Sequence, residues 1–262
     1  MPPFLTNPRN PDIKQARQLH QRKTRDETGL FVVEGIRHVG EAVAAGAPVQ
    51  YLCYAPDLLK SEFAHDLLEK QRQAGLRVYA LAPDVFRSIA DKDNPQGILA
   101  IVRRPSVQLS NLNPKTHPWL VALVAPQDPG NIGTIIRTMD AVGANGLILL
   151  DGGADPGHPN AVRASLGALF WMPVVSATFA EFTAWAAAQK YQLIGTSENG
   201  SVDYQHARYT RPCILLMGSE RDGLTPEQEA ACTLMVRLPM VGRVTSLNLA
   251  VATGVMLYAM VA

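Results

Sequence analysis

Residues 119–142 read WLVALVAPQDPGNIGTIIRTMDAV. Residues 119–126 of this stretch are all apolar, which predicts a strand buried on both faces, as the strands of parallel sheets are. A polar turn follows, and residues 132–142 are expected to form a helix. A buried strand that leads through a polar turn into a helix is typical of an α/β fold.

The same alternation continues to the end of the chain. Further apolar runs predict strands at residues 146–151, 173–177, 192–197, 213–218 and 235–239. Helices are expected at residues 160–170, 181–190 and 226–232, and at the C-terminus. Because the strands are apolar on both faces and alternate with helices, we predict a parallel sheet covered on both sides.

The first 104 residues show a shorter α/β pattern. Their periodicity predicts strands at 30–35, 49–55, 77–82 and 97–102, and helices within 12–28, 36–45 and 62–74. Residues 105–118 carry three prolines among Ser, Asn and Thr, a composition typical of a linker. We therefore predict a small α/β domain (1–104), a linker (105–118) and a larger parallel-sheet domain (119–262).

The composition is that of a globular cytoplasmic protein. Hydrophobic residues make up 47% and charged residues 18% of the chain, which is enough apolar material for a proper core. The three cysteines form no CxxC pair, so neither a disulfide framework nor a thiolate zinc site is expected. The N-terminus lacks the apolar core of a signal peptide. Residues 247–262 are too short to span a bilayer and are expected to form a buried helix.

Positive charge is concentrated at the N-terminus, although the formal net charge is only +1. Within the first 25 residues the single acid Asp12 faces six cations: Arg9, Lys14, Arg17, Arg22, Lys23 and Arg25. Such a cluster can neutralise the phosphates of a nucleic acid, and it can equally be a solvated helix face.

Three polar loops carry the residues best suited to chemistry. They follow apolar strands and read QDPGNIGTIIR (127–137), MGSERDGL (217–224) and LPMVGRVTSLN (238–248). Ligands of parallel sheets bind beyond the carboxyl ends of the strands, so we expect the three loops to converge on one pocket.

Each loop also has a purely structural interpretation. Residues 128–131 are a good turn and helix cap, Gly218 and Gly223 permit tight turns, and Ser246 can cap the last helix. No GxGxxG follows a strand and no GxxxxGK[ST] occurs, which disfavours a doubly wound nucleotide-dependent enzyme. His158, before a proline in a loop, is more typical of an exposed residue than of a base. The six scattered histidines predict no metal site.

The loop sequences resemble the signature motifs of the SpoU-type RNA ribose methyltransferases, a branch of the SPOUT superfamily. The resemblance rests on PGNIGTIIRT (129–138), GSERDGL (218–224) and LPMVGRVTSLNLA (238–250), with VRASLGALF (162–170) between them. Residues 14–35 are similar to the substrate-binding domain often fused ahead of this catalytic domain, a small α/β sandwich related to RNA-binding ribosomal proteins.

The resemblance implies a fold that physical rules alone would not predict. Threading of one chain segment through another is nearly absent among proteins, so a plain doubly wound sheet would be the default expectation. The family instead has a deep trefoil knot whose second and third motifs wrap S-adenosylmethionine. On this analogy the cofactor-binding residues are Met217, Gly218, Leu238, Met240 and Leu247.

The implied reaction moves a methyl group from a sulfonium to a ribose 2′-hydroxyl. The family's first motif puts Asn131 and Arg137 at the reacting centre. Because an arginine is a poor proton acceptor, we favour a role for Arg137 in gripping a phosphate and stabilising the developing alkoxide, while the alternative of arginine as the base stays open. Glu220 is expected to orient Asn131 or Arg137, and Ser246 and Asn248 to bind the cofactor or the target nucleotide.

The predicted partner is a structured RNA, with ribosomal RNA favoured over transfer RNA by family association. Lys14, Arg17, Arg22, Lys23 and Arg25 are the candidate RNA-binding residues. Family members are commonly dimers through the knot region, and the apolar terminal helix suits either such a homodimer interface or an internal core. The main alternative function is a non-catalytic RNA-binding or ribosome-assembly protein on the same fold. Retention of the five candidate catalytic residues argues against it.

Overall fold

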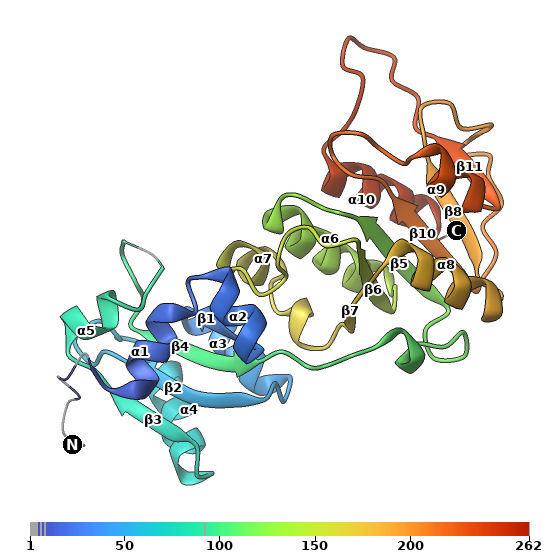
Figure 1. The fold of residues 1–262 in the computed structure, drawn as a ribbon. Helices are drawn as coiled ribbons and strands as arrows, with labels where there is room; N and C mark the ends of the chain where they lie inside the picture. Colours follow the sequence, from blue (N-terminus) through green and yellow to red (C-terminus); the bar gives the residue numbers. More distant parts are fainter. Residues whose placement is uncertain (1–4, 6, 8, 92, 262) are drawn as a thin grey trace. The chain divides into compact units, whose positions relative to one another are not determined.

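The structure, a computed structural model, describes residues 5, 7, 9–91 and 93–261 (Figure 1). Part of the N-terminal stretch in which no signal peptide is expected, namely residues 1–4, 6 and 8, lies outside the described residues. The chain forms two compact units. Unit 1 contains the residues up to Pro105 together with Gly157–Trp171, and unit 2 contains Ser106–Pro156 and the residues from Met172 onwards.

Unit 1 is built on a four-stranded sheet. Its strands are β1 (Leu30–Glu34), β2 (Val49–Tyr54), β3 (Arg77–Ala80) and β4 (Ile98–Arg103), in the order β1-β4-β2-β3. Strand β4 is antiparallel to both β1 and β2, and β2 is parallel to β3. The four strands expected from the apolar runs are therefore confirmed.

Helices cover both faces of this sheet (Figure 1). Side chains of β1 alternate between two cores, with Phe31 and Val33 in the core under α3 (Ile36–Ala44) and α4 (Glu62–Gln73). Leu30 and Val32 face the other core, which α1 (Pro11–Gln18) and α5 (Pro83–Arg87) close. Helix α5 was not expected from the sequence, because five residues are too few for helical periodicity to be recognised.

A sharp corner replaces the continuous helical pattern expected within residues 12–28. The chain leaves α1 after Gln18 and enters α2 (Arg22–Thr28) three residues later. Arg25 is only 2% exposed, and its Nη1 donates to the carbonyl oxygens of Leu19 (2.7 Å) and His20 (2.9 Å). The prediction that Arg25 binds RNA is therefore wrong: its guanidinium satisfies carbonyls at the end of α1, where a positive charge is also favourable.

We expect Arg25→Ala to lower the free energy of unfolding by about 2 kcal/mol, because it leaves one buried and one partly buried carbonyl oxygen without their charged donor. Arg22→Ala is the matched control, since Arg22 is an exposed residue of the same helix whose i,i+4 pair with Asp26 is worth less than about 0.5 kcal/mol. Urea denaturation measures both. Equal stabilities of the two variants would contradict the structural role of Arg25.

Unit 2 contains a seven-stranded sheet in which every pair of neighbours is parallel. The strand order is β7-β6-β5-β10-β8-β11-β9. The strands are β5 (Trp119–Val124), β6 (Gly146–Leu150), β7 (Val174–Ala177), β8 (Gln192–Thr196), β9 (Val202–Asp203), β10 (Cys213–Met217) and β11 (Leu234–Arg237). The predicted parallel sheet is confirmed, and only the two-residue strand β9 was not expected.

Helices lie on both faces of this sheet as well (Figure 1). Helix α8 (Phe179–Ala188) packs its Phe182 and Ala186 on one face. Helices α6 (Pro129–Val142) and α10 (Leu249–Ala259) pack against each other over the opposite face, and α9 (Pro226–Ala231) precedes β11. None of the described helices is both long and apolar enough to cross a bilayer.

The two units differ from the predicted domains at two places. Residues 106–118 of the predicted linker belong to unit 2, where Leu112 is buried in the core beside α8. The prolines of this stretch obscure its few apolar residues, so its composition resembles that of a linker. Residues 157–171, expected in the larger domain, pack within unit 1 and contain α7 (Pro159–Ala164) and the 3-10 helix η2 (Ala168–Phe170).

Candidate active site

The three polar loops meet at the side chain of Asn131. This residue lies in the first turn of α6 and is 7% exposed. Its Nδ2 donates to Glu220 Oε1 (3.0 Å), and its Oδ1 accepts a hydrogen bond from Asn248 Nδ2 (3.0 Å). Residues from the first, second and third loops are thus joined by direct hydrogen bonds. We call this chain Glu220–Asn131–Asn248 the amide relay.

Helix capping explains how two members of the relay are placed. Asp128 caps α6 by accepting from the backbone N–H of Gly130 (2.8 Å), which fixes the first turn on which Asn131 lies. Asn248 caps α10 through Oδ1, which accepts from the N–H of Ala250 (2.9 Å), and this leaves its Nδ2 to donate to Asn131. Capping of α6 by the first loop is therefore compatible with the convergence of the loops, whereas the expectation that Ser246 caps the last helix is wrong, because Asn248 is the cap.

The Glu220 carboxylate also holds the loop that follows β5. Its Oε2 accepts from the backbone N–H of Gln127 (3.0 Å). Partial burial raises the pKa of Glu220, but the hydrogen bonds from Gln127 and from the Asn131 amide outweigh this effect and hold the pKa below its ordinary value. Glu220 is therefore ionised at neutral pH. Of the two partners considered for it, Asn131 is the one it contacts.

A pocket of about 500 Å³ lies beside the relay. All five candidate cofactor residues line it, and so do Glu220 and Ser246. The remaining lining comes from the same two loops, from the end of β8 and from two helices: Ser219, Arg221–Leu224, Thr245, Thr196–Asn199, Glu229, Leu249 and Ala252. Asn131 and Asn248 are not among the residues that line the pocket and reach it through the hydrogen bond from Asn131 to Glu220.

The residues at the end of β8 were missed by the sequence analysis. Thr196, Ser197, Glu198 and Asn199 follow an apolar strand, which is the same signal that identified the other three loops. The pocket has a negative character, because four carboxylates and a single guanidinium, that of Arg221, line it. The carboxylates are those of Glu198, Glu220, Asp222 and Glu229. Such a pocket suits a cationic or neutral polar ligand better than a phosphate.

Gly218 is required by the loop itself. Ser219 and Gly223 exchange two backbone hydrogen bonds of 3.1 Å, which close the loop into a tight hairpin. A Cβ at Gly218 would lie 2.1 Å from the carbonyl carbon of Gly223. Its structural interpretation is thus correct, and the loop it allows forms part of the pocket wall.

Arg137 is not brought to the relay. It is exposed on α6, and within the described residues no hydrogen bond or ion pair holds its guanidinium. It lies six positions after Asn131, which places the two side chains about 120° apart around the helix. Arg137 is consequently available to a ligand that approaches from outside unit 2.

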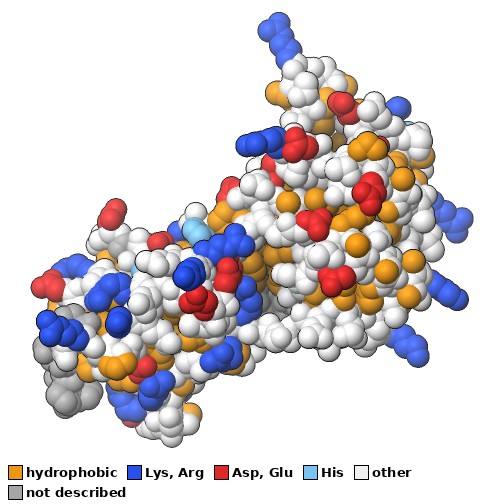
Figure 2. All heavy atoms as spheres, in the orientation of Figure 1, with side chains coloured by type: hydrophobic (Ala, Val, Ile, Leu, Met, Phe, Trp, Pro, Cys, Tyr) orange, Lys and Arg blue, Asp and Glu red, His pale blue; other side chains and the backbone are white. Residues whose placement is uncertain are grey.

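Four of the five candidate RNA-binding residues lie at the surface of unit 1, where basic and acidic side chains are interleaved (Figure 2). Arg22 and Lys23 form exposed i,i+4 pairs with Asp26 and Glu27. Arg17 Nη2 donates to Ser88 Oγ (2.8 Å), and Lys14 is exposed. The cluster is therefore less positive than the sequence suggests.

His158 and a metal site were the remaining possibilities considered for the chemistry. His158 caps α7, and its Nδ1 accepts from the backbone N–H of Asn160 (3.1 Å). Within the part of the chain that the structure describes, no group of three or more His, Cys, Asp or Glu residues could hold a metal ion.

Models of two known protein families match the chain. The model of the SpoU rRNA Methylase family matches residues 118–258, more than half of the chain. The chain belongs to the SpoU methylase family. A second model, the MRM3-like substrate binding domain, matches residues 10–100, which lie in unit 1 of this SpoU methylase. Both resemblances predicted from the motifs are confirmed.

Several known proteins match this SpoU methylase over most of its length. A 23S rRNA (uridine(2479)-2′-O)-methyltransferase of Streptomyces viridochromogenes is 35% identical over 92% of the chain and 85% of that protein. The 23S rRNA (guanosine(2553)-2′-O)-methyltransferase RlmP of Bacillus subtilis is 29% identical over 97% of both. The crystal structure of an AdoMet-bound rRNA methyltransferase from Sinorhizobium meliloti is 37% identical, with a TM-score of 0.88, covering 98% of this chain and 97% of that one.

We expect Gly218→Ala to lower the free energy of unfolding by about 2 kcal/mol, because the added methyl group meets backbone atoms that cannot give way. Gly242→Ala is the matched control, since a Cβ there meets nothing within 4 Å, and its effect should stay within about 0.5 kcal/mol. Thermal unfolding followed by circular dichroism compares them. A Gly218→Ala protein as stable as the control would show that the hairpin does not need glycine.

Proposed function

We propose that this SpoU methylase transfers a methyl group from S-adenosylmethionine to a ribose 2′-hydroxyl of ribosomal RNA in the cytoplasm. The observation that carries the proposal is the amide relay, which joins the first motif to the wall of the pocket formed by the second and third. The names of its relatives support ribosomal RNA over transfer RNA as the substrate.

The pocket wall fits the proposed cofactor in chemistry and size. Leu238, Met240 and Leu247 offer apolar area to an adenine ring, while Met217 and Gly218 bring backbone groups to the same space. The carboxylates around the pocket complement the positive charge of a sulfonium. When bound, the cofactor supplies an activated methyl group.

The residues of the relay are proposed to organise the target ribose. Glu220, held as a carboxylate, fixes the amide of Asn131, and Asn248 fixes its carbonyl oxygen, so the side chain of Asn131 has one orientation. Ser246, in the pocket wall with no hydrogen bond to a described residue, is free to bind the cofactor or the nucleotide. Arg137, exposed and uncommitted, is proposed to grip an RNA phosphate and to stabilise the alkoxide that develops on the 2′-oxygen.

We expect Arg137→Ala to reduce kcat about 10²- to 10³-fold, because it removes a charge that acts mainly in the transition state, with the Kd for S-adenosylmethionine unchanged. Arg208→Ala is the control, since Arg208 is also an exposed arginine of unit 2. Transfer of a labelled methyl group to ribosomal RNA measures kcat, and calorimetry measures the Kd. Wild-type turnover by Arg137→Ala would remove this residue from the mechanism.

The basic experiment on the function is a comparison of ribosomal RNA from cells with and without the protein. Mass-spectrometric mapping should find one ribose methyl group that depends on the gene and that the purified protein restores in vitro. A protein that binds RNA without binding S-adenosylmethionine would instead be a non-catalytic RNA-binding protein.

We also propose a homodimer and a trefoil knot for unit 2. Helix α10 buries Met256 and Leu257, yet exposes Val251 (52%) and Tyr258 (63%), which lie seven residues apart and so on one face. An apolar face of this kind suits a second copy of the chain. The chain reaches this helix from β11, after β10 has inserted between β5 and β8, and the proposed knot lies in this return.

We expect Tyr258→Arg to shift sedimentation from dimer to monomer, because the charge would be buried without a partner at the interface. Phe63→Arg, a similar change at an exposed aromatic residue of unit 1, should leave the dimer intact. Analytical ultracentrifugation at micromolar concentration distinguishes the two. A dimeric Tyr258→Arg protein would place the interface elsewhere.

A further inference from the structure

Residues 157–171 belong to the transferase by sequence and to unit 1 by packing. They lie inside the match to the SpoU rRNA Methylase family, between β6 and β7. Val162 is nonetheless 2% exposed within the core of unit 1 that α3 and α4 cover, and Leu169 and Phe170 pack against the same core. The chain therefore passes between the two units at three points: after Pro105, after Pro156 and after Trp171.

The backbone of this segment is shaped to fit α3. Gly167 has a φ of +94°, and a Cβ there would lie 2.7 Å from Glu41 Oε2. Ser165 is 1% exposed and donates its hydroxyl to the carbonyl oxygen of Val162 (2.8 Å). The segment therefore has buried apolar and polar side chains and a glycine in close contact with α3. It is an integral part of the packing of unit 1.

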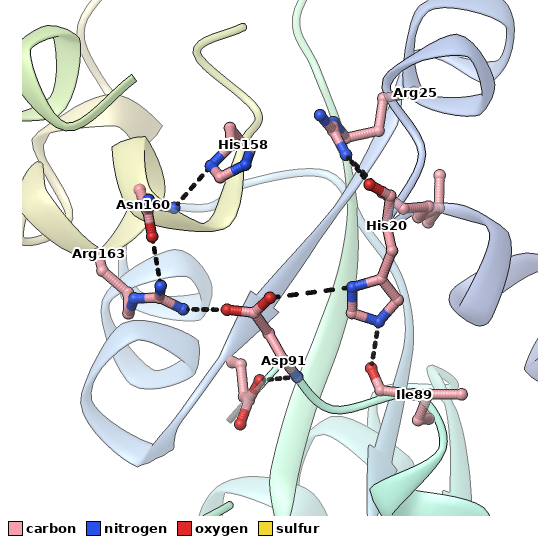
Figure 3. Close-up of polar contacts among 9 residues, drawn as sticks. His20, Arg25, Ile89, Asp91, His158, Asn160 and Arg163 are labelled. Carbon is pink, nitrogen blue, oxygen red and sulfur yellow. Dashed lines mark hydrogen bonds and ion pairs between the residues drawn. The ribbon is translucent and has the colours of Figure 1, made fainter. Parts of the chain in front are cut away.

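One ion pair fastens the segment to unit 1 (Figure 3). Arg163 Nη1 donates to Asp91 Oδ2 at 2.6 Å, and its Nη2 donates to Asn160 Oδ1 at 2.5 Å. The side chains of Arg163 and Asp91 are 29% and 33% exposed. This partial burial makes the loss of one partner costlier than at a fully exposed pair, because the other charge remains without compensation.

The corner between α1 and α2 lies on the opposite side of Asp91. His20 Nε2 donates to the carbonyl oxygen of Ile89 (3.1 Å), which turns its Nδ1 toward Asp91 Oδ1 at 4.0 Å, a distance that makes an ion pair only when the imidazole carries both protons. The backbone N–H of Asp91 donates to Oε2 of the buried Glu34 (2.7 Å). The same corner carries Arg22 and Lys23, two of the residues proposed to bind RNA. His20, which is hydrogen-bonded to Ile89, thus lies between this corner and the Arg163–Asp91 pair.

We infer that Arg163 and Asp91 are positioning residues for methyl transfer to RNA. This inference rests on the proposed function. A single flexible linker would let RNA held by unit 1 sample many positions, and reaction rates fall steeply when the reacting groups are not held in register. The chain instead passes between the units three times, and this restricts that freedom. Two of these passages lie at the ends of residues 157–171, the segment that Arg163 anchors. The ion pair acts on RNA methylation through the segment, without contacting the cofactor.

Exchange of the two charges tests the inference in the full-length protein. Arg163→Glu and Asp91→Arg should each lower kcat/KM for ribosomal RNA about tenfold, mostly through KM, with an unchanged Kd for S-adenosylmethionine. The double variant, in which the pair is reversed, should recover most of the loss. Arg72→Glu is the matched control, because Arg72 forms an exposed pair with Glu69 in the same unit, and it should stay within about twofold of wild type.

The other outcomes overturn the inference. A double variant as slow as Arg163→Glu alone would mean that Arg163 contacts RNA itself, and normal activity of the single variants would mean that the anchor has no role. Where Arg163→Glu fails to fold, Asp91→Asn keeps the size of the side chain and removes its charge, and it must show the same loss in kcat/KM. Hydrogen exchange should then be faster in residues 157–171 of the variant, whereas unchanged protection there would refute the anchor. A wild-type protein that methylates no RNA would refute the proposed function instead, and hydrogen exchange would still report on the anchor.

Discussion

The hydrogen bonds of Asn131 are the constraint on which the active site depends. Its buried amide has one donor and one acceptor group engaged, by Glu220 and Asn248, and each partner belongs to a loop that is far away in the sequence. A buried amide that loses a partner is costly, so the three loops are held in one arrangement. The two of these loops that line most of the pocket are thereby fixed in place.

The charge of Glu220 maintains this constraint at neutral pH. Its lowered pKa means that the carboxylate accepts from Gln127 and Asn131 until the solution becomes acidic. Because the folded-state pKa lies below the ordinary value, the stabilisation is present above the ordinary pKa and is lost as the pH falls through the lowered one. Charged side chains also hold segments together in unit 1. Arg25 donates to a carbonyl oxygen at the end of α1, and Arg163 donates to Asp91.

Much of the fold and the outline of the site could be predicted from the sequence. Apolar runs such as residues 119–124 and 213–217 identify strands buried on both faces, and the polar residues after them identify loops that meet at one sheet edge. Composition cannot show that Arg25 is buried, because the corner that buries it is a tertiary feature. For the same reason residues 157–171 read as part of the larger domain. Residues 196–199 are polar and follow an apolar strand, which is the pattern that identified the other loops, but they were overlooked. The position of Arg137 on the exposed face of α6, away from Asn131, is not visible in the loop motif.

The most direct test of the relay is a double-mutant cycle in kcat/KM between Glu220→Gln and Asn248→Asp. The second substitution keeps an oxygen to cap α10 but removes the amide that donates to Asn131. If the three residues act as one unit, each variant should lose about 100-fold and the double variant little more than either. Losses that multiply in the double variant would contradict the account, because they would mean that Glu220 and Asn248 act independently of Asn131.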